Sequence, residues 1–596
     1  MLTFNRRQLL GLGVGTLAAS AVAGRLPASA NNVTGYVESI ISRMTLPQKV
    51  GQLMVSEVYG ADPTVEHTGN LQLFGIGKAV DVVRELHLGG VIYFAWTDSY
   101  AGGPDGVAQL SNTLQAAALE TRVTATKGQP QGNKVSVPLL VATDQEQGIV
   151  TRFGPPATQF PGAMALGAGR SEANAKAAAE ITGMELRAVG INTNFAPVAD
   201  VNVNPANPVI GVRSFSSDPE LVSRMVAAQV EGYQGAGRVS ASAKHFPGHG
   251  DTAVDSHYGL PLITHSREEW ERLDAPPFRA AIAAGIDMIM TAHLLLPAFD
   301  DSGDPATLSK PILTGVLRDQ LGYDGVVITD ALNMAGVREM YGDAEVAVRA
   351  LEAGVDILLM SPSPIAARDA VLEAVTSGRI SEAEIDRKVA RVLRMKHRRG
   401  IIAEPMCDPA LIGSVVGIPQ HLEIADAVTD RTITLIRNDG VLPMPVSGKK
   451  VLVTGWGAGT TTNVQAAFTA AGATATRLNY NSPTAAQISA AVTAAQDVDL
   501  VVVLTQNAAP NSALVRLVNA LVATGKPVVA VAVRNPYDVA HYEAPAEICT
   551  YSYAPVMPAS LVRVITGEVN PSGTLPVDVP SPSGGVAYPF GHGLSY

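Results

Sequence analysis

Between about residues 36 and 400, short apolar runs alternate with segments of helical periodicity, and this alternation constrains the fold more than any other feature. The apolar runs cover residues 90–94, 137–142, 190–195, 239–243, 287–291, 325–329 and 356–360. Helical periodicity is present at 36–54, 174–189, 219–235, 267–284 and 344–354. Short apolar runs separated by helices are typical of buried parallel strands that crossover helices connect.

About seven or eight strand–helix units between residues 36 and 400 predict an α/β fold. The predicted architecture is a (β/α)8 TIM-type barrel over residues 36–405, irregular at its start. A doubly wound open sheet is the alternative. The barrel makes a specific prediction, because its functional side chains should stand at the carboxyl ends of the strands.

Further apolar runs after residue 430 predict a second domain. They lie at 451–454, 498–505 and 527–533. The pattern is typical of a smaller, doubly wound αβα domain over 431–596, which a proline-containing linker at 406–430 joins to the barrel. Gly455, Gly457 and Gly459 have the spacing G-x-G-x-G, whereas the dinucleotide fingerprint is G-x-G-x-x-G. We therefore interpret them as a tight turn into a helix and predict no nucleotide cofactor.

Residues 1–30 are typical of an export signal. Arg6 and Arg7 precede an apolar run at 10–24, and Ala28-Ser29-Ala30 matches an A-x-A cleavage site. The paired arginines predict the twin-arginine route and an extracytoplasmic location, whether periplasmic, cell-wall or secreted. The run is shorter than the ~20 residues of a membrane span. We expect cleavage after Ala30 and no stable membrane insertion afterwards; a retained anchor is the alternative.

The composition is that of a globular chain and argues against nucleic-acid binding. Hydrophobic residues make up 47% and charged residues 16% of the chain, and the net charge is −11. Nucleic-acid-binding domains usually carry a basic patch, and the one basic helix expected here, at 387–399, is interpreted as a solvated helix packed on the barrel. Cys407 and Cys549 could form one disulfide, but we favour two free thiols.

Polar or charged residues follow five consecutive predicted strands, at the point where each strand ends. They are Asp144, Asp200, Lys244 with His245, His293 and Asp330. Any one of them could be an ordinary loop residue. Together they predict a shared polar pocket at the carboxyl end of the barrel.

The segment KHFPGHGDTAVDSHYGLP, residues 244–261, concentrates histidine and aspartate. Zinc accepts both residue types, but the histidines are four and eight residues apart in a Gly-rich loop, which is not a structured zinc motif. We therefore predict no metal. Asp255 stands two residues before His257, and a carboxylate so placed can orient an imidazole and stabilise the imidazolium. This indicates a proton-transfer pair; a polar loop without chemistry is the alternative.

Asp330 directly follows the apolar run 325–329. A carboxylate held at a strand end by buried neighbours suits a nucleophile that attacks an electrophilic carbon. The alternative is an N-cap of the next segment. The remaining candidates supply many hydrogen-bond donors and acceptors, as a polyhydroxylated substrate requires, although a phosphate or carboxylate ligand would also fit. They are Asp144, Arg152, Arg213, Lys244 and His245.

Several motifs, in order along the chain, resemble glycoside hydrolase family 3, and specifically its bacterial β-N-acetylglucosaminidases. The matching segments are ATDQE at 142–146, NFAPVAD at 194–200, NPVIG at 207–211, RSF at 213–215, KHFPGHG at 244–250, DSH at 255–257 and ITD at 328–330. The resemblance extends over about residues 36–596. It implies the two-domain form of the family, a barrel followed by an αβ domain.

The resemblance implies a retaining exo-β-N-acetylglucosaminidase that needs no metal or organic cofactor. Asp330 would be the nucleophile, and His257 the general acid/base, oriented by Asp255. The implied substrates are peptidoglycan fragments or chito-oligosaccharides, cleaved at the non-reducing end. The positions that match the family's sugar-binding residues are Asp144, Arg152, Arg213, Lys244 and His245.

One departure from the family pattern and several alternatives stay open. The family often has Asp-x-Glu-Gly-Gly-Arg where this chain has DQEQGI at 144–149, so Ile149 would change the packing of the loop or the rim of the pocket. The alternatives are a β-glucosidase of the same family, an N-acetylglucosaminide phosphorylase, a metal-dependent hydrolase and a non-catalytic sugar-binding protein. The oligomeric state and the role of the second domain are left open.

Overall fold

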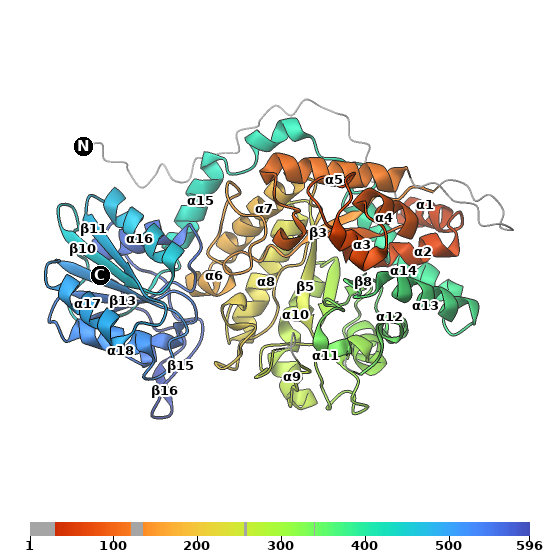
Figure 1. Ribbon diagram of the computed structural model, residues 1–596. Coiled ribbons are helices and arrows are strands. Elements are labelled where there is room, and N and C mark those ends of the chain that lie inside the picture. Colours follow the sequence, from red (N-terminus) through yellow and green to blue (C-terminus); the bar gives the residue numbers. More distant parts are fainter. Residues whose placement is uncertain (1–29, 121–134, 256–258, 339) are drawn as a thin grey trace, which may run out of the picture.

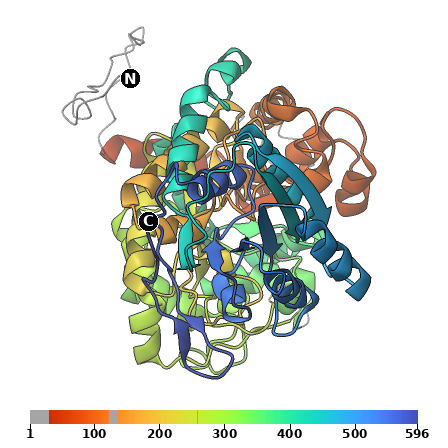
Figure 2. The ribbon, with the colours of Figure 1, turned by 90° about the vertical axis from the view of Figure 1, so that its left-hand side faces the viewer.

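The computed structural model describes residues 30–120, 135–255, 259–338 and 340–596 (Figure 1). Two sheets organise the chain, an eight-stranded sheet in the first part and a six-stranded sheet in the second. Figure 2, in which the second domain faces the viewer, shows its sheet in front of the barrel. The predicted export signal lies outside the described residues, apart from Ala30.

The first sheet is a closed parallel barrel, as the alternation of runs and helices predicts. Its strands follow the order β7-β6-β5-β4-β3-β2-β1-β8, and a parallel bridge between Ile328 and Ile357 joins the two ends. The amide of Thr329 donates to the carbonyl of Ile357 at 3.0 Å. The strands are β1 (Met54–Glu57), β2 (Gly90–Ile92), β3 (Leu140–Thr143), β4 (Thr193–Asn194), β5 (Ser240–Phe246), β6 (Met288–Thr291), β7 (Val326–Ile328) and β8 (Leu358–Leu359).

The helical periodicity at 36–54 corresponds to more than one element. The structure has two helices there, α1 (Ala30–Ile41) and α2 (Leu46–Gln52), followed by β1. Thr45 caps α2 in a reciprocal pair of hydrogen bonds with Gln48, and Pro47 stands in its first turn, so a new helix begins at this point. All four residues of β1 are buried.

The other helices surround the barrel (Figure 1). The helix predicted over 267–284 is divided into two at Asp274, because Pro276 and Pro277 can stand only in the first turn of a new helix. A π-helix covers Pro311–Gln320. The α-helices are α3 (Thr68–Phe74), α4 (Ala79–Leu86), α5 (Gly103–Leu119), α6 (Ala163–Gly169), α7 (Glu172–Ala188), α8 (Pro219–Gln234), α9 (Arg267–Leu273), α10 (Ala275–Ala283), α11 (Ala335–Arg338), α12 (Asp343–Ala353), α13 (Pro364–Thr376) and α14 (Glu382–Arg398).

The second domain is an αβα sandwich with strand order β11-β10-β12-β13-β14-β9, in which only β9 is antiparallel to its neighbour. The predicted runs correspond to β10, β12 and β13. Helices α16 and α19 contribute to one core, and α17 and α18 to the other. The elements are β9 (Thr434–Asn438), β10 (Lys450–Gly455), α16 (Ala458–Ala470), β11 (Thr474–Asn479), α17 (Ala485–Ala495), β12 (Leu500–Thr505), α18 (Ala513–Val522), β13 (Val528–Ala532), β14 (Ala546–Cys549), α19 (Met557–Thr566), β15 (Val579–Pro580) and β16 (Val586–Tyr588).

The segment predicted as a linker contains a helix. After a 3₁₀ turn at Pro409–Ser414, α15 (Pro419–Asp430) packs against α19 on one side and α6 and α7 on the other (Figure 1). Cys407 and Cys549 are both free thiols. Among the described ranges, every helix is too short or too polar to cross a membrane.

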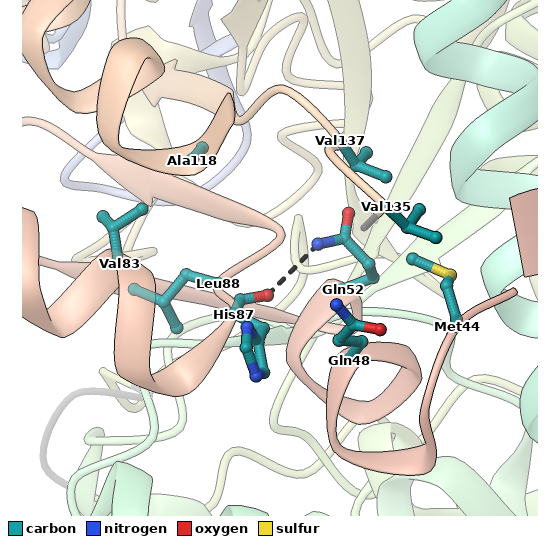
Figure 3. A pocket seen from close by; sticks show the side chains of 9 residues that line it. All are labelled: Met44, Gln48, Gln52, Val83, His87, Leu88, Ala118, Val135 and Val137. Atoms are coloured by element: carbon teal, nitrogen blue, oxygen red, sulfur yellow. Dashed lines mark hydrogen bonds between the residues drawn. The ribbon is translucent and has the colours of Figure 1, made fainter. Parts of the chain in front are cut away.

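The amino end of the barrel is closely packed. A cavity of about 10 Å³ lies there between α2, α4 and α5, which is room for about one water molecule. Figure 3 shows Gln52 at its edge, where its side-chain amide donates to the carbonyl of His87 at 3.1 Å. The side-chain oxygen of Gln52 accepts from Lys396 of α14 at 3.0 Å. The larger pocket described next is at the opposite end.

Candidate active site

A pocket of about 340 Å³ lies at the carboxyl ends of the barrel strands. Its volume is within the range of about 300–1,000 Å³ that is usual for small-molecule sites. Every described residue that lines it comes from the barrel. They are Phe94, Trp96, Asp144, Glu146, Val150, Arg152, Val209, Arg213, Lys244, His245, His249, Asp330, Ala331, Asn333, Met334 and Met360.

Six of the eight residues predicted from the sequence line this pocket. Asp255 is described but is not one of the lining residues. His257 lies outside the described residues, so its role as acid/base and its pairing with Asp255 stay predictions. The six that the structure brings together are Asp144, Arg152, Arg213, Lys244, His245 and Asp330.

Glu146 joins the two basic residues at the base of the pocket. Arg213 donates to it twice, from Nε to Oε2 at 2.9 Å and from Nη2 to Oε1 at 2.8 Å. Lys244, which is 2% exposed, lies with Nζ 2.7 Å from Oε1 of Glu146 and 2.8 Å from Oδ1 of Asp144. Burial alone would raise the pKa of Glu146, but Arg213 and Lys244 outweigh it and hold that pKa well below its usual range.

The same balance applies to the two basic side chains. Burial alone would lower the pKa of Lys244, but Asp144 and Glu146 raise it, and Glu146 likewise raises the pKa of Arg213. All three members of this group are therefore charged at neutral pH. Glu146 belongs to the motif at 142–146 but is not among the site residues predicted from the sequence.

Asp200 fixes the orientation of His245. Its Oδ2 lies 2.7 Å from Nδ1 of His245, and its Oδ1 accepts from the backbone amides of His245 and His249 at 3.2 and 2.7 Å. Because a carboxylate can only accept, Nδ1 of His245 carries the proton, and Nε2 is left to accept from Nη2 of Arg213 at 3.3 Å. Burial would raise the pKa of Asp200, but His245 and His249 lower it overall.

Asp330 follows β7 and presents a carboxylate to the pocket. Its Oδ1 accepts from the amide of Ala331 at 2.7 Å. His293, a buried residue two positions after β6, supports this turn, with Nε2 3.0 Å from the carbonyl of Ala331. Burial would raise the pKa of Asp330, but His245 and His293 lower it overall, so the carboxylate is ionised. Helix α11 begins only at Ala335, which argues against an N-cap role for Asp330.

An aromatic wall stands beside these charged groups. Trp96 stacks on Phe94, with ring centroids 3.9 Å apart and planes 14° apart. The guanidinium of Arg152 lies 5.4 and 5.6 Å from the two ring centroids. Neither aromatic residue is among the site residues predicted from the sequence, because an apolar residue at the end of a strand has the same pattern as a core residue.

The loop after β5 is tied to the protein by its other polar residues. His249 is buried, and its Nδ1 lies 2.9 Å from the hydroxyl of Thr252. Asp251 pairs with Nε2 of His265 at 3.0 Å, and Nδ1 of His265 pairs with the buried Asp274 at 2.7 Å. Within the described part of the chain, no three histidine, cysteine, aspartate or glutamate side chains are arranged to hold a metal ion.

The second domain contacts the loops that carry pocket residues. Asn535, just after β13, accepts from the amide of Val212 at 3.1 Å, next to Arg213. Tyr537 accepts from the side-chain amide of Asn202 at 3.0 Å. Ile149, at the departure from the family pattern, packs against the core that the second domain forms with α6.

Comparisons with known proteins match both domains. The glycosyl hydrolase family 3 N terminal domain matches residues 45–395, and the family 3 C-terminal domain matches residues 433–596. Beta-hexosaminidase A of Pseudoalteromonas piscicida is 37% identical over 391 residues, which span 61% of this chain and 62% of that protein. The beta-N-acetylglucosaminidase/beta-glucosidase of Cellulomonas fimi is 32% identical over 419 residues, 69% of this chain and 68% of that protein.

Solved structures of similar fold include a member of the same family. The family 3 beta-N-acetylglucosaminidase from Paenibacillus sp. str. FPU-7 has a TM-score of 0.79 and 38% identity, over 90% of this chain and 99% of that one. A beta-glucoside phosphorylase shares the fold with a TM-score of 0.75 at 23% identity. The match to the Pseudoalteromonas enzyme covers less than two thirds of that protein, whereas the N-terminal family domain alone covers more than half of this chain. The chain belongs to glycoside hydrolase family 3.

Proposed function

We propose that this protein is an exported, retaining exo-β-N-acetylglucosaminidase. The observation that carries the proposal is the ionised carboxylate of Asp330 in a pocket beside the charged group of Glu146, Lys244 and Arg213. An anionic nucleophile next to fixed donors is what substitution at a sugar's anomeric carbon requires. The names of the relatives above support the choice of N-acetylglucosamine.

In the first step, an oxygen of Asp330 attacks the anomeric carbon. The amide of Ala331 already donates to Oδ1, which leaves Oδ2 available to form the new C–O bond. The bond from the anomeric carbon to the leaving oxygen breaks, and His257 gives that oxygen a proton. The product is a covalent glycosyl–aspartate.

In the second step, water replaces Asp330. His257, now neutral, takes a proton from the water. The oxygen of the water bonds to the anomeric carbon, and the bond from that carbon to the carboxylate of Asp330 breaks. Two displacements at one carbon retain its configuration. A histidine here takes the place of the second carboxylate that most retaining glycosidases use.

The remaining pocket residues would hold the sugar. Asp144 and Glu146 can accept hydrogen bonds from hydroxyl groups, and Lys244, Arg213 and His245 are positioned by ion pairs and hydrogen bonds before any ligand enters. Such preorganisation lowers the cost of ordering side chains on binding. A pocket of this size suits one terminal sugar, which supports exo action. The substrates that we propose are peptidoglycan fragments or chito-oligosaccharides outside the cytoplasm.

The test is hydrolysis of 4-nitrophenyl β-N-acetylglucosaminide and of the corresponding β-glucoside by wild type, Asp330→Ala and His257→Ala. We expect cleavage of the N-acetyl substrate, loss of turnover in both variants, and partial rescue by azide. In His257→Ala, azide should attack the glycosyl–aspartate and give the β-azide. In Asp330→Ala it should attack the substrate directly and give the α-azide.

His397→Ala is the matched control, because His397 lies on α14 and does not line the pocket. It should keep the wild-type rate. Full activity in Asp330→Ala, or cleavage of the glucoside alone, would contradict the proposal. A sugar phosphate formed on addition of phosphate would identify a phosphorylase, and loss of activity on chelation would identify a metal-dependent hydrolase.

A further inference from the structure

We propose that Trp96 is a stacking platform for the first unit of the leaving group, and that this unit is a pyranose ring. The inference rests on the proposed function, since it concerns the part of the substrate that leaves when the terminal sugar is cut. It adds a binding position outside the charged base of the pocket. It also assigns a role to the exposed aromatic ring at this site.

The platform is exposed yet held in place. The side chain of Trp96 is 57% exposed, whereas Phe94, on which it stacks, is 4% exposed. Phe94 covers one face of the indole, so the opposite face is the one open to a ligand. Rigid, exposed aromatic rings bind ligands at a low cost in conformational entropy.

The backbone beneath Trp96 is fixed by a tight turn. Residues Ala95–Thr97 form a 3₁₀ turn after β2. The buried hydroxyl of Thr97 donates to the carbonyl of Phe94 at 2.9 Å and lies 2.7 Å from the hydroxyl of Ser99. Trp96 therefore stands on a turn that hydrogen bonds hold in place.

Arg152 gives the platform an unused donor. Its backbone amide donates to the side chain of Gln145 at 2.8 Å, and its guanidinium lies beside the two stacked rings. In the part of the chain that the structure describes, Arg152 makes no salt bridge, and its buried Nε has no hydrogen-bond partner. The guanidinium of Arg152 lines the pocket, where it can donate to a hydroxyl or amide oxygen of a ligand.

The position of the platform indicates which part of the substrate it meets. The charged residues that would hold the terminal sugar are buried or nearly so, whereas Trp96 is the exposed member of the wall. When the terminal sugar occupies the bottom of the pocket, the next sugar unit of the substrate lies at the exposed side of the pocket, where Trp96 is. A pyranose presents a flat face of C–H groups to an aromatic ring and oxygens at its edge, which matches an indole face with a guanidinium beside it.

The kinetic test compares N,N′-diacetylchitobiose with methyl β-N-acetylglucosaminide, which differ mainly in whether the leaving alcohol is a sugar. Trp96→Ala should lower kcat/KM for chitobiose about fivefold to tenfold more than for the methyl glycoside, because only the former loses a stacking contact. Trp96→Phe should restore part of the difference. Leu411→Ala, at an exposed apolar residue away from the pocket, should leave both substrates unchanged.

A binding measurement gives a second readout. The chain has three tryptophans, of which Trp270 is 1% exposed and Trp456 is partly buried. In the Asp330→Asn variant, chitobiose should change the tryptophan emission, and the added Trp96→Phe substitution should abolish that change. A change that persists without Trp96, or no change with it, would reject the platform.

The outcomes separate the two proposals. If wild type cleaves both substrates but Trp96→Ala lowers them equally, the platform is rejected and the proposed function stands. If wild type cleaves neither substrate, the proposed function is rejected and the role of Trp96 with it.

Discussion

At the scale of single residues, Glu146 holds the two basic side chains of the pocket together. It accepts from Arg213 through both oxygens and pairs with Lys244, and all three side chains are largely buried. Removing one partner of a buried ion pair leaves the other charges uncompensated, which costs about 3–5 kcal/mol. The arrangement therefore matters for stability as well as for binding.

We predict that Glu146→Gln lowers the free energy of unfolding by about 3 kcal/mol and lowers kcat/KM at least about a hundredfold. The neutral amide keeps the shape of the side chain but cannot balance Arg213 and Lys244. Urea unfolding and initial rates measure the two effects. The matched control is Glu404→Gln, which breaks an exposed pair with Arg238 and should cost less than about 1 kcal/mol. Equal losses in the two variants would contradict the prediction.

His249 should make stability depend on pH. Burial, followed by the nearby His245, lowers the pKa of His249 to about 4, whereas an unfolded histidine has a pKa of about 6.5. Between these two values the unfolded chain binds a proton that the folded chain does not. Stability therefore rises with pH in this window and falls as the pH drops from 6.5 towards 4.

We predict that His249→Asn reduces this dependence by about 2 kcal/mol between pH 7 and pH 5. Urea unfolding of wild type and variant at both pH values measures this change as a double difference, in which the titrating groups that do not interact with His249 cancel. Parallel pH profiles would show that His249 does not carry the dependence.

Most charged residues of the pocket were predictable from the sequence, with Glu146 as an exception, but the apolar ones were not. Asp144, Lys244 and Asp330 could be identified because a charged residue at the end of a buried strand has few structural reasons to be there. Trp96 gave no such signal, since aromatic residues at strand ends also belong to cores. The partner of Asp200 could not be identified, because the contact with His245 joins two different strand ends.

At the scale of elements, α14 seals the amino end of the barrel. The basic pattern of this helix predicts solvated side chains, but Lys396 is fully buried and donates to Gln52 at 3.0 Å and to the carbonyls of Gly89 and Pro138 at 2.9 and 2.7 Å. Arg391 pairs with the buried Asp356 just before β8 at 3.1 Å. Helical periodicity locates such a helix but does not show which of its charges are buried.

We predict that Lys396→Met destabilises the fold by about 3 kcal/mol, because three carbonyl oxygens lose their donor in a buried site. The kcat of the folded fraction should stay at the wild-type value, since the pocket is at the opposite end of the barrel. Arg394→Met, at an exposed position of the same helix, is the control and should be nearly neutral. Unfolding curves and active-site-normalised rates test both statements. A loss of kcat with unchanged stability would contradict the prediction.

The predicted and observed elements differ at β1 and α15, where one local sequence pattern is typical of two different structures. β1 was hidden because Met54 and Val55 continue the apolar pattern of α2, and the four-residue strand is too short to show alternation. The helix α15 was hidden by Pro409 and Pro419, which suggested a linker, although Pro419 stands in the first turn of the helix, where proline is favoured.

At the scale of the whole molecule, the two domains share a core. Met164, Ala165 and Ala168 of α6, with Val212, pack in the same buried cluster as α17 and α18 of the second domain. Arg170, at the end of α6, donates to the hydroxyl of Thr574 at 2.6 Å. The sequence could not reveal this docking, because apolar residues of α6 that face a second domain look the same as residues that face the barrel.

The second domain should help to position the pocket residue Arg213 through a contact made by Asn535. Its Oδ1 accepts from the amide of Val212 at 3.1 Å and would lie 2.7 Å from a Cβ at Gly211, whose φ is +45°. This contact braces the turn that carries Arg213, and Arg213 in turn holds Glu146 and contacts His245. Asn535 is thus a positioning residue that belongs to the other domain.

We predict that Asn535→Ala lowers kcat/KM about tenfold, because the amide of Val212 loses its partner and Arg213 is held less firmly. Asn535→Asp keeps an oxygen acceptor and should recover part of the loss. Arg170→Gln weakens the same interface away from the pocket, so it should lower stability without lowering kcat/KM. If Arg170→Gln reduced kcat/KM as much as Asn535→Ala, the effect would come from docking in general, and the hydrogen bond from Asn535 would have no role of its own.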